Sequence, residues 1–160
     1  MDDVAAMRVA LAEAELSPLM GDVPVGAVVL CGDEVVAQAH NERELRSDPT
    51  AHAEILAIRA ATASFGRFEL GDCVLVVTLE PCAMCAGALL VAGLGRLVFA
   101  AFDPKAGACG SRYNLLADPR MGREIATSGG VLEQEASGQL SAFFASLRSR
   151  SPRDLPGPGI

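Results

Sequence analysis

Hydrophobic residues follow two different patterns in the first 40 residues of the chain. Between residues 2 and 16 they recur every three or four positions with acidic residues between them, which predicts an amphipathic helix. Residues 24–30 and 35–40 each contain paired valines and lie on either side of a Gly-Asp turn. This second pattern predicts a β-hairpin.

A strand, a helix and a second strand are predicted in the middle of the chain. Before these elements, the Asp-Pro-Thr sequence at 48–50 signals the start of a helix that extends to about Phe65. The continuous apolar run at 73–79 is typical of a strand buried on both faces. Pro81 then begins a second helix, and residues 96–101 form the next strand, so this spacing indicates a parallel crossover.

The last third of the chain is predicted to contain loops and one long helix. Residues 103–130 are rich in glycine and polar residues, with a short helix at 113–116. Residues 131–150 form an amphipathic helix, and 151–160 carry too much proline and glycine to pack. The helix is expected to bury Leu140, Phe143, Phe144 and Leu147. The expected fold is therefore α/β: a single domain over residues 1–150, built as a three-layer α/β/α sandwich around a mixed sheet of about five strands.

Length and charge limit the class of protein. At 160 residues and 51% hydrophobic, the chain can bury one substantial core but is too short for two ordinary domains. No apolar run approaches the roughly 20 residues that cross a bilayer, and the acidic start is unlike a secretory signal, so we expect a cytoplasmic protein without a membrane span. The net charge of −7 argues against a nucleic-acid partner. It is concentrated in residues 1–48, however, and residues 49–160 balance to zero, so the sequence is compatible with a local basic face.

The five cysteines do not indicate a disulfide framework, because their number is odd and they are scattered. Metal binding fits the close pair Cys82 and Cys85 better. Cys31, Cys73 and Cys109 each lie among apolar or small residues, so we expect them to be buried thiols.

Two motifs together indicate a catalytic zinc site, namely His-Ala-Glu at 52–54 and Pro-Cys-Ala-Met-Cys at 81–85. Cys82 and Cys85 are three residues apart in the first turn of a predicted helix, where their sulfurs share one face and the helix dipole favours thiolate. With His52 they supply three zinc ligands and leave the fourth position open for water. Glu54 is not a ligand and would transfer protons, so the pattern predicts hydrolytic deamination of an amidine-like ring carbon.

His52 and Glu54 cannot share one face of a regular helix, because residues two apart point about 200° away from each other. We therefore expect His52 in the first turn, reaching past the end of the helix, while Glu54 lines the adjacent wall. Two helix N-termini then converge on one zinc ion, each after a strand, where open α/β sheets place their pockets.

Each motif alone has other interpretations. A lone CxxC can be a redox pair or half of a structural zinc site. A structural site would need a fourth ligand, and His40 is the only other histidine of the chain. The proline before Cys82 and the 29 residues (53–81) between His52 and Cys82 favour the catalytic site.

With these motifs in place, the sequence resembles bacterial tRNA adenosine deaminases, which convert the wobble adenosine of the anticodon to inosine. The blocks that carry the resemblance occur in order within residues 22–111: DVPVGAVV, HNER, DPTAHAEILAIRAA, LVVTLEPCAMCAGAL and FDPKAGACGS. The resemblance implies a cytidine deaminase-like fold, a zinc ion (Zn2+) as cofactor, a tRNA anticodon stem-loop as partner, and a homodimer with RNA lying across both subunits.

The resemblance also implies roles for individual residues. His52, Cys82 and Cys85 bind zinc, and Glu54 transfers protons. Asn41 hydrogen-bonds the flipped base, and Val25 forms an apolar part of the base pocket. The residues expected to contact RNA are Asp103, Lys105, Arg148 and Arg150.

The chain departs from the family's pattern in the half expected to contact RNA. It has Gly122 and Arg123 where an Asn-His pair is common, and Arg112 and Tyr113 where apolar residues are usual. The leading hypothesis is zinc-dependent deamination of the tRNA wobble adenosine. The alternative keeps zinc and Glu54 but acts on a free nucleobase or nucleoside, such as guanine, adenine or cytosine. A third hypothesis is a non-catalytic, structural zinc domain.

Overall fold

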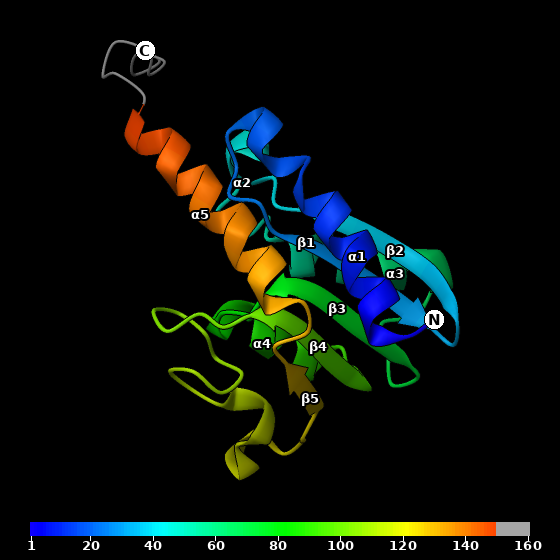
Figure 1. Ribbon diagram of the computed structural model, residues 1–160. Coiled ribbons are helices and arrows are strands. Elements are labelled where there is room, and N and C mark those ends of the chain that lie inside the picture. The colour runs from blue at the N-terminus through cyan, green and yellow to red at the C-terminus, as the bar shows by residue number, and fades with distance from the viewer. Residues whose placement is uncertain (150–160) are drawn as a thin grey trace.

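The computed structural model describes residues 1–149. It shows a central sheet with helices on both faces (Figure 1). The helices are α1 (Asp3–Ala14), α2 (Arg43–Arg46), α3 (Ala53–Phe65), α4 (Ala83–Val91) and α5 (Glu133–Ser149). The strands are β1 (Gly26–Cys31), β2 (Glu34–His40), β3 (Cys73–Leu79), β4 (Arg96–Ala101) and β5 (Ala126–Gly129). Short 3₁₀ turns lie at Ser17–Met20, Leu115–Ala117 and Pro119–Met121. Arg150 and the predicted tail at 151–160 lie outside the described residues.

The five strands are ordered β2-β1-β3-β4-β5. The predicted hairpin pairs β1 with β2, and β1 is also antiparallel to β3. The pairs β3–β4 and β4–β5 are parallel, so the predicted crossover through α4 and the mixed sheet are confirmed. β5 was expected to be loop, because its sequence Ala-Thr-Ser-Gly is short and exposed on every residue. Only its pairing with β4 makes it an edge strand.

Alternate residues of the strands build two separate cores, since successive side chains of a strand point to opposite faces. On one face, side chains of the central strands pack under α3 and α4; they include Ala27, Val29, Leu75, Val77 and Leu97. On the other face, the intervening side chains pack under α1 and α5; they include Val28, Leu30, Val76 and Val98. The three-layer α/β/α sandwich is therefore confirmed, and Figure 1 shows α1 and α5 together in front of the sheet.

A close approach of α1 to β1 explains one glycine. A Cβ atom at Gly26 would lie 2.0 Å from the carbonyl oxygen of Ala10 and 2.6 Å from the backbone nitrogen of Ala14. The helix can therefore lie directly on the strand only because residue 26 has no side chain. Gly26 follows Val25, so this contact also fixes one end of the segment that reaches the candidate site.

The closing helix α5 buries less of its hydrophobic side than predicted. Phe143 is buried and Leu140 is partly buried, but Phe144 and Leu147 are 44% and 40% exposed. The prediction that all four are buried was therefore wrong for the last two. The physical reason is that the second half of α5 extends beyond the sheet, as Figure 1 shows, and has no strand beneath it.

Cys31 and Cys73 form a disulfide, so the prediction that both are buried free thiols was wrong. They are 42 residues apart in the sequence, but the antiparallel register of β1 and β3 places them directly opposite each other, with Cα atoms 4.4 Å apart. Such a distance permits a disulfide bond. Cys109, by contrast, is a buried free thiol, as predicted.

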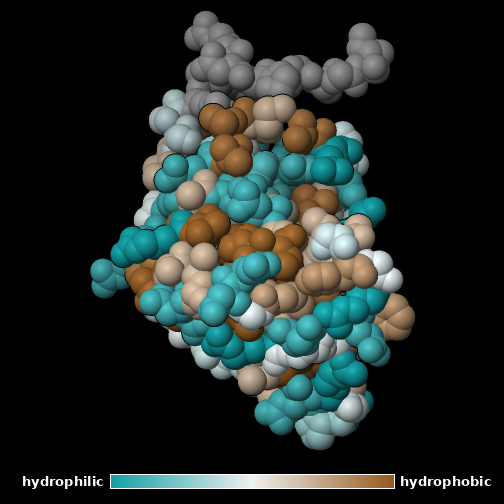
Figure 2. Space-filling model, turned by 90° about the vertical axis from the view of Figure 1, so that its right-hand side faces the viewer, coloured by the Kyte–Doolittle hydropathy of each residue, from teal (hydrophilic) through white to brown (hydrophobic). Residues whose placement is uncertain are grey.

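The surface is mixed in polarity. On the face seen in Figure 2, hydrophilic side chains surround separate hydrophobic groups. Among residues 1–149, none of the helices combines the length and the apolar character needed to cross a membrane.

Candidate active site

His52 lies immediately before helix α3 in extended backbone conformation (φ −74°, ψ 150°). The helix begins at Ala53, three to five residues later than the Asp-Pro-Thr signal predicted. The reason is local. The Asp48 carboxylate accepts hydrogen bonds from the backbone N–H and the hydroxyl of Thr50, and these bonds stabilise a non-helical turn at residues 48–50. The prediction that His52 lies in the first turn was therefore wrong, because His52 precedes the helix. Its expected separation from Glu54 is nevertheless found, since Glu54 lies in the first turn.

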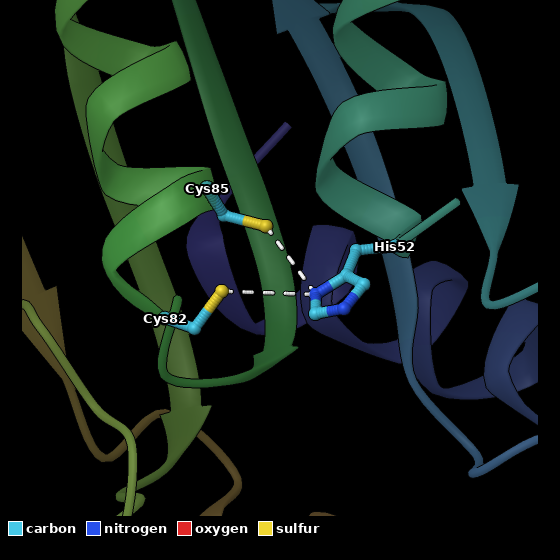
Figure 3. Close-up of side chains that lie close together, drawn as sticks. All are labelled: His52, Cys82 and Cys85. Atoms are coloured by element: carbon cyan, nitrogen blue, oxygen red, sulfur yellow. Dashed lines mark hydrogen bonds between the residues drawn. The ribbon is translucent and has the colours of Figure 1, made fainter. Parts of the chain in front are cut away.

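The two cysteines lie at the start of helix α4, directly across from His52 (Figure 3). Cys82 precedes the helix in extended conformation (φ −72°, ψ 174°), and Cys85 is buried in the first turn. The prediction that Pro81 begins this helix was wrong, because the extended residue Cys82 delays the first turn to Ala83. The Nδ1 atom of His52 lies 3.7 Å from the sulfur of Cys82 and 3.5 Å from the sulfur of Cys85.

These three side chains have the geometry of a metal site. Their ligand atoms all lie within 4.8 Å of one another. His40, the alternative fourth ligand, is engaged elsewhere, because its Nδ1 atom lies 2.7 Å from a carboxylate oxygen of Glu13. Within residues 1–149, the structure groups no fourth histidine, cysteine or carboxylate with this set. The arrangement therefore supports a site with one coordination position open to solvent or substrate.

The two thiols have pKa values shifted in opposite directions, and this favours binding of a cation. A hydrogen bond with Cys85 lowers the pKa of Cys82 to about 3, although burial acts in the opposite direction. The hydrogen bond with Cys82 also raises the pKa of His52. Cys85 has a raised pKa, because its hydrogen bond with Cys82 and its burial disfavour a second thiolate. One thiolate therefore forms readily, and a cation would be needed to stabilise the second.

Glu54 is a buried carboxyl group of the site whose pKa lies near neutrality. Its side chain is only 4% exposed, and this burial raises its pKa to about 7. A carboxyl group with such a pKa can both accept and release a proton near neutral pH, which is the property required of a general acid–base.

A small cavity opens in front of these residues. Its volume is about 190 Å³, below the range of about 300–1,000 Å³ typical of sites for drug-sized ligands, so it suits a single flat ring. It brings together predicted residues from five separate segments of the chain. They are Val25, Asn41, His52, Glu54, Cys82 and Asp103. Cys85 is fully buried and is not part of the cavity lining.

Asn41 connects the cavity to helix α3. Its side-chain oxygen accepts a hydrogen bond of 2.9 Å from the backbone N–H of Ala53, and its amide nitrogen donates one of 3.1 Å to the carbonyl of Val23. The side chain is 8% exposed and its orientation is fixed by these two bonds. One amide hydrogen and one lone pair of the carbonyl oxygen are left for a ligand.

The residues predicted to contact RNA are dispersed. Asp103 lines the cavity, and its carboxylate also accepts hydrogen bonds from the backbone N–H groups of Lys105 and Ala106. Lys105 is exposed and does not line the cavity. Arg148 lies in the last turn of α5, away from the cavity lining, and Arg150 lies outside the described residues.

Two charged residues of the cavity were missed by the sequence reasoning. Arg43 lies in α2, between Asn41 and His52, and Glu80 directly precedes Pro81. Both lie within or next to the motifs that carry the family resemblance, which was the available signal. Their chemistry becomes apparent only from the cavity.

Comparison with known proteins agrees with this geometry. Residues 1–131 match the family of MafB19-like deaminases. The tRNA-specific adenosine deaminase of Bacillus subtilis is 44% identical over 144 residues, which are 90% of this chain and 89% of that protein. A solved tRNA:A34 deaminase, studied for A-to-I editing at the wobble position of tRNA, has a TM-score of 0.82 and 38% identity, over 85% of this chain and 99% of that chain. Guanine deaminase from Nitrosomonas europaea is also similar, with a TM-score of 0.77 and 27% identity over 89% of this chain and 84% of that chain. The chain therefore belongs to the MafB19-like deaminases and to the family of tRNA-specific adenosine deaminases.

Proposed function

We propose that this protein converts adenosine to inosine by hydrolysis at the wobble position of a tRNA anticodon, in the cytoplasm. The observation that carries the proposal is the cavity in which the Glu54 carboxyl, with a pKa of about 7, lies beside one imidazole and two cysteine sulfurs. The strong similarity to tRNA-specific adenosine deaminases over most of the chain supports the substrate class.

Zinc is the metal that fits the donor set. His52, Cys82 and Cys85 offer one nitrogen and two sulfurs, a combination typical of zinc sites, and three protein ligands are typical of catalytic ones. When bound there, zinc supplies a Lewis acid that makes water nucleophilic at neutral pH.

Glu54 carries the proton transfers of the reaction. The oxygen of water forms a bond to C6 of adenine, and Glu54 accepts the proton that the water loses. Glu54 then delivers this proton to N1 of the ring. As the bond from C6 to the exocyclic nitrogen breaks, Glu54 transfers the remaining hydroxyl proton of the added oxygen to that nitrogen, which departs as ammonia and leaves a carbonyl group at C6. A carboxyl group held near its pKa can perform both steps without a large free-energy cost in either direction.

Asn41 and Val25 provide the recognition of the base. The free amide hydrogen and carbonyl lone pair of Asn41 can pair with polar edges of the ring, and its two structural hydrogen bonds keep it in that orientation. Val25 is buried and lines the cavity, so it supplies an apolar surface against the ring. Base recognition of this kind requires the nucleotide to leave its stack, which costs least in an anticodon loop.

The nucleotides on either side of the target base would contact the rim of the cavity. Asp103 and Lys105 belong to one loop of this rim, and Arg148 lies in the last turn of α5. Arg150, the fourth residue expected to contact RNA, lies outside the described residues. Positive side chains at these places can offset the acidic surface of the N-terminal third.

A homodimer is part of the proposal, and helix α4 supplies its candidate surface. Cys85, Ala86 and Leu89 of this helix are buried, whereas Val91 is 81% exposed and Met84 is 37% exposed. A buried core helix would not need these last two hydrophobic side chains on its outer side.

The experiment that tests the function compares an anticodon stem-loop carrying adenosine at the wobble position with free guanine, adenine and cytosine. We expect inosine in the RNA and no ammonia from the free bases. Ammonia from a free base alone would instead place the protein with enzymes such as the similar guanine deaminase. Wild-type protein and Glu54→Gln should contain equal zinc, and only the wild type should turn over.

A further inference from the structure

Glu80 is a buried carboxylate that the proposed chemistry does not use. Only three carboxylates are buried among residues 1–149, namely Asp22, Glu54 and Glu80, and Glu80 is 2% exposed. It lies between the end of β3 and the metal-binding segment at Cys82. A buried carboxylate is costly unless hydrogen bonds compensate for the lost water, so its partners indicate what it does.

All hydrogen bonds of the Glu80 carboxylate come from one loop, residues 103–111. Oε1 accepts from the backbone N–H groups of Cys109 (3.1 Å) and Ser111 (2.9 Å). Oε2 accepts from the backbone N–H of Asp103 (3.0 Å) and from the Ser111 hydroxyl. These four bonds join both ends of the loop to a single side chain.

The same loop is packed tightly against the carboxylate and against the metal-binding segment. A Cβ atom at Gly107 would lie 2.4 Å from the carboxyl carbon of Glu80, so the loop closes on it only because residue 107 is glycine. The backbone N–H of Ala108 donates a 2.8 Å hydrogen bond to the carbonyl of Pro81, and Gly107 forms a β-bridge with Cys82. These contacts therefore fix the position of the loop relative to Cys82, one of the candidate zinc ligands.

The loop forms part of the cavity lining through Asp103 and Ala106, and Asn41 lines the same cavity from another segment of the chain. Because the cavity is only about 190 Å³ in volume, the position of this loop decides whether a flat ring fits. Because the Glu80 carboxylate already accepts four hydrogen bonds, it is not free to act on a substrate proton.

We propose that Glu80 is a positioning residue, which holds residues 103–111 against the metal-binding segment so that the loop forms a fixed wall of the base cavity. The inference rests on the proposed function for the identity of the base, but not for the role of the loop. Without the carboxylate, the loop would move away from the cavity, and substrate would bind more weakly while the metal ligands stayed in place.

The variant Glu80→Gln tests this proposal. An amide turns one acceptor oxygen into a donor, so at least one backbone N–H of the loop loses its partner whichever way the amide is oriented. We expect a KM at least tenfold higher, a kcat within threefold of wild type, and unchanged zinc content. Hydrogen exchange at the backbone amides of Asp103, Cys109 and Ser111 should become at least tenfold faster. Should Glu80→Gln fail to fold, Ser111→Ala, which removes only the hydroxyl bond, should raise KM about threefold.

Thr78→Val is the matched control. Thr78 lies two residues earlier on β3, is also buried, and accepts a 3.1 Å hydrogen bond from the backbone N–H of Gly26. Loss of this hydrogen bond should lower the melting temperature. It should change neither KM nor the hydrogen-exchange rates of the loop amides by more than twofold. If Glu80→Gln behaves like Thr78→Val, Glu80 has only a general structural role. Loss of zinc, or a lower kcat at unchanged KM, would also overturn the proposal.

The outcome for Glu80 is separable from that of the proposed function. KM is measured with whichever substrate the wild-type protein deaminates, RNA or free base. If it deaminates neither, the proposed function fails, and hydrogen exchange of the loop alone decides the role of Glu80.

Discussion

Replacing Glu54 by glutamine should inactivate the protein and, at the same time, change how its stability depends on pH. Glutamine has nearly the same shape but cannot carry a proton between water and base. General acid–base groups contribute about 10²–10⁴-fold to rate, so kcat of the zinc-loaded variant should fall by about that factor.

The stability effect follows from the burial of the Glu54 carboxylate. Burial is the main cause that raises its pKa from 4.5 to about 7. Because one pKa unit corresponds to about 1.4 kcal/mol, the ionised form costs at most about 3 kcal/mol in the folded protein. The folded state binds this proton more tightly than the unfolded state does. The stabilisation by protonated Glu54 is therefore complete below pH 4.5 and is lost as the pH rises through 7. Glutamine has no such dependence.

The assay is urea unfolding of wild type and Glu54→Gln between pH 5 and pH 8, on protein stripped of metal, since a bound cation would add its own charge to the site. The free energy of unfolding of the variant, relative to wild type, should be about 2 kcal/mol larger at pH 8 than at pH 5. Glu133→Gln, at an exposed position of α5, is the control and should follow wild type. If the free energies of unfolding of Glu54→Gln and wild type change in parallel with pH, burial of the ionised carboxylate does not carry the expected free-energy cost. An unchanged kcat would refute the catalytic role of Glu54.

Three further perturbations follow from the structure. Cys85→Ser should lower the zinc content measured by mass spectrometry well below one ion per chain, whereas Cys109→Ser should keep it; full zinc in the first variant would contradict the proposed ligands. Removing the disulfide by replacing Cys31 and Cys73 with serine should lower the free energy of unfolding by about 4 kcal/mol in non-reducing buffer, by the loop-closure relation for 42 residues. A wild-type protein equally stable with and without reductant would show that the bond contributes nothing. Val91→Arg should produce a monomer in size-exclusion chromatography with light scattering, and a dimer that persists would place the interface elsewhere.

The candidate metal ligands could be predicted because the relevant information is local. A proline and two cysteines three apart allow only a few backbone geometries, and the sulfurs share one face in most of them. The sequence also shows that His52 and Glu54 cannot both point into the site from a regular helix, since residues two positions apart in a helix do not share a face. The resolution of this conflict needed the structure: His52 stays extended because Asp48 and Thr50 form a turn just before it.

The partners of Asn41 could not be predicted from the sequence. This side chain joins Val23 to Ala53, two segments that become neighbours only after β2 has folded back along β1. Glu80 is a similar case, because its hydrogen-bond donors lie 23 to 31 residues further along the chain. Neither interaction leaves a periodic pattern in the sequence.

The sequence by itself determined the alternation of strands and helices, the two hydrophobic faces of the sheet and the two motifs that hold the candidate metal ligands, because each depends on residues within one or two turns or on a repeating pattern. The tertiary structure alone decided that Cys31 faces Cys73, that residues 126–129 form an edge strand, and that one carboxylate holds the loop beside the cavity. These features depend on strand register and on contacts between distant segments, and such contacts form only when the whole chain packs around its sheet.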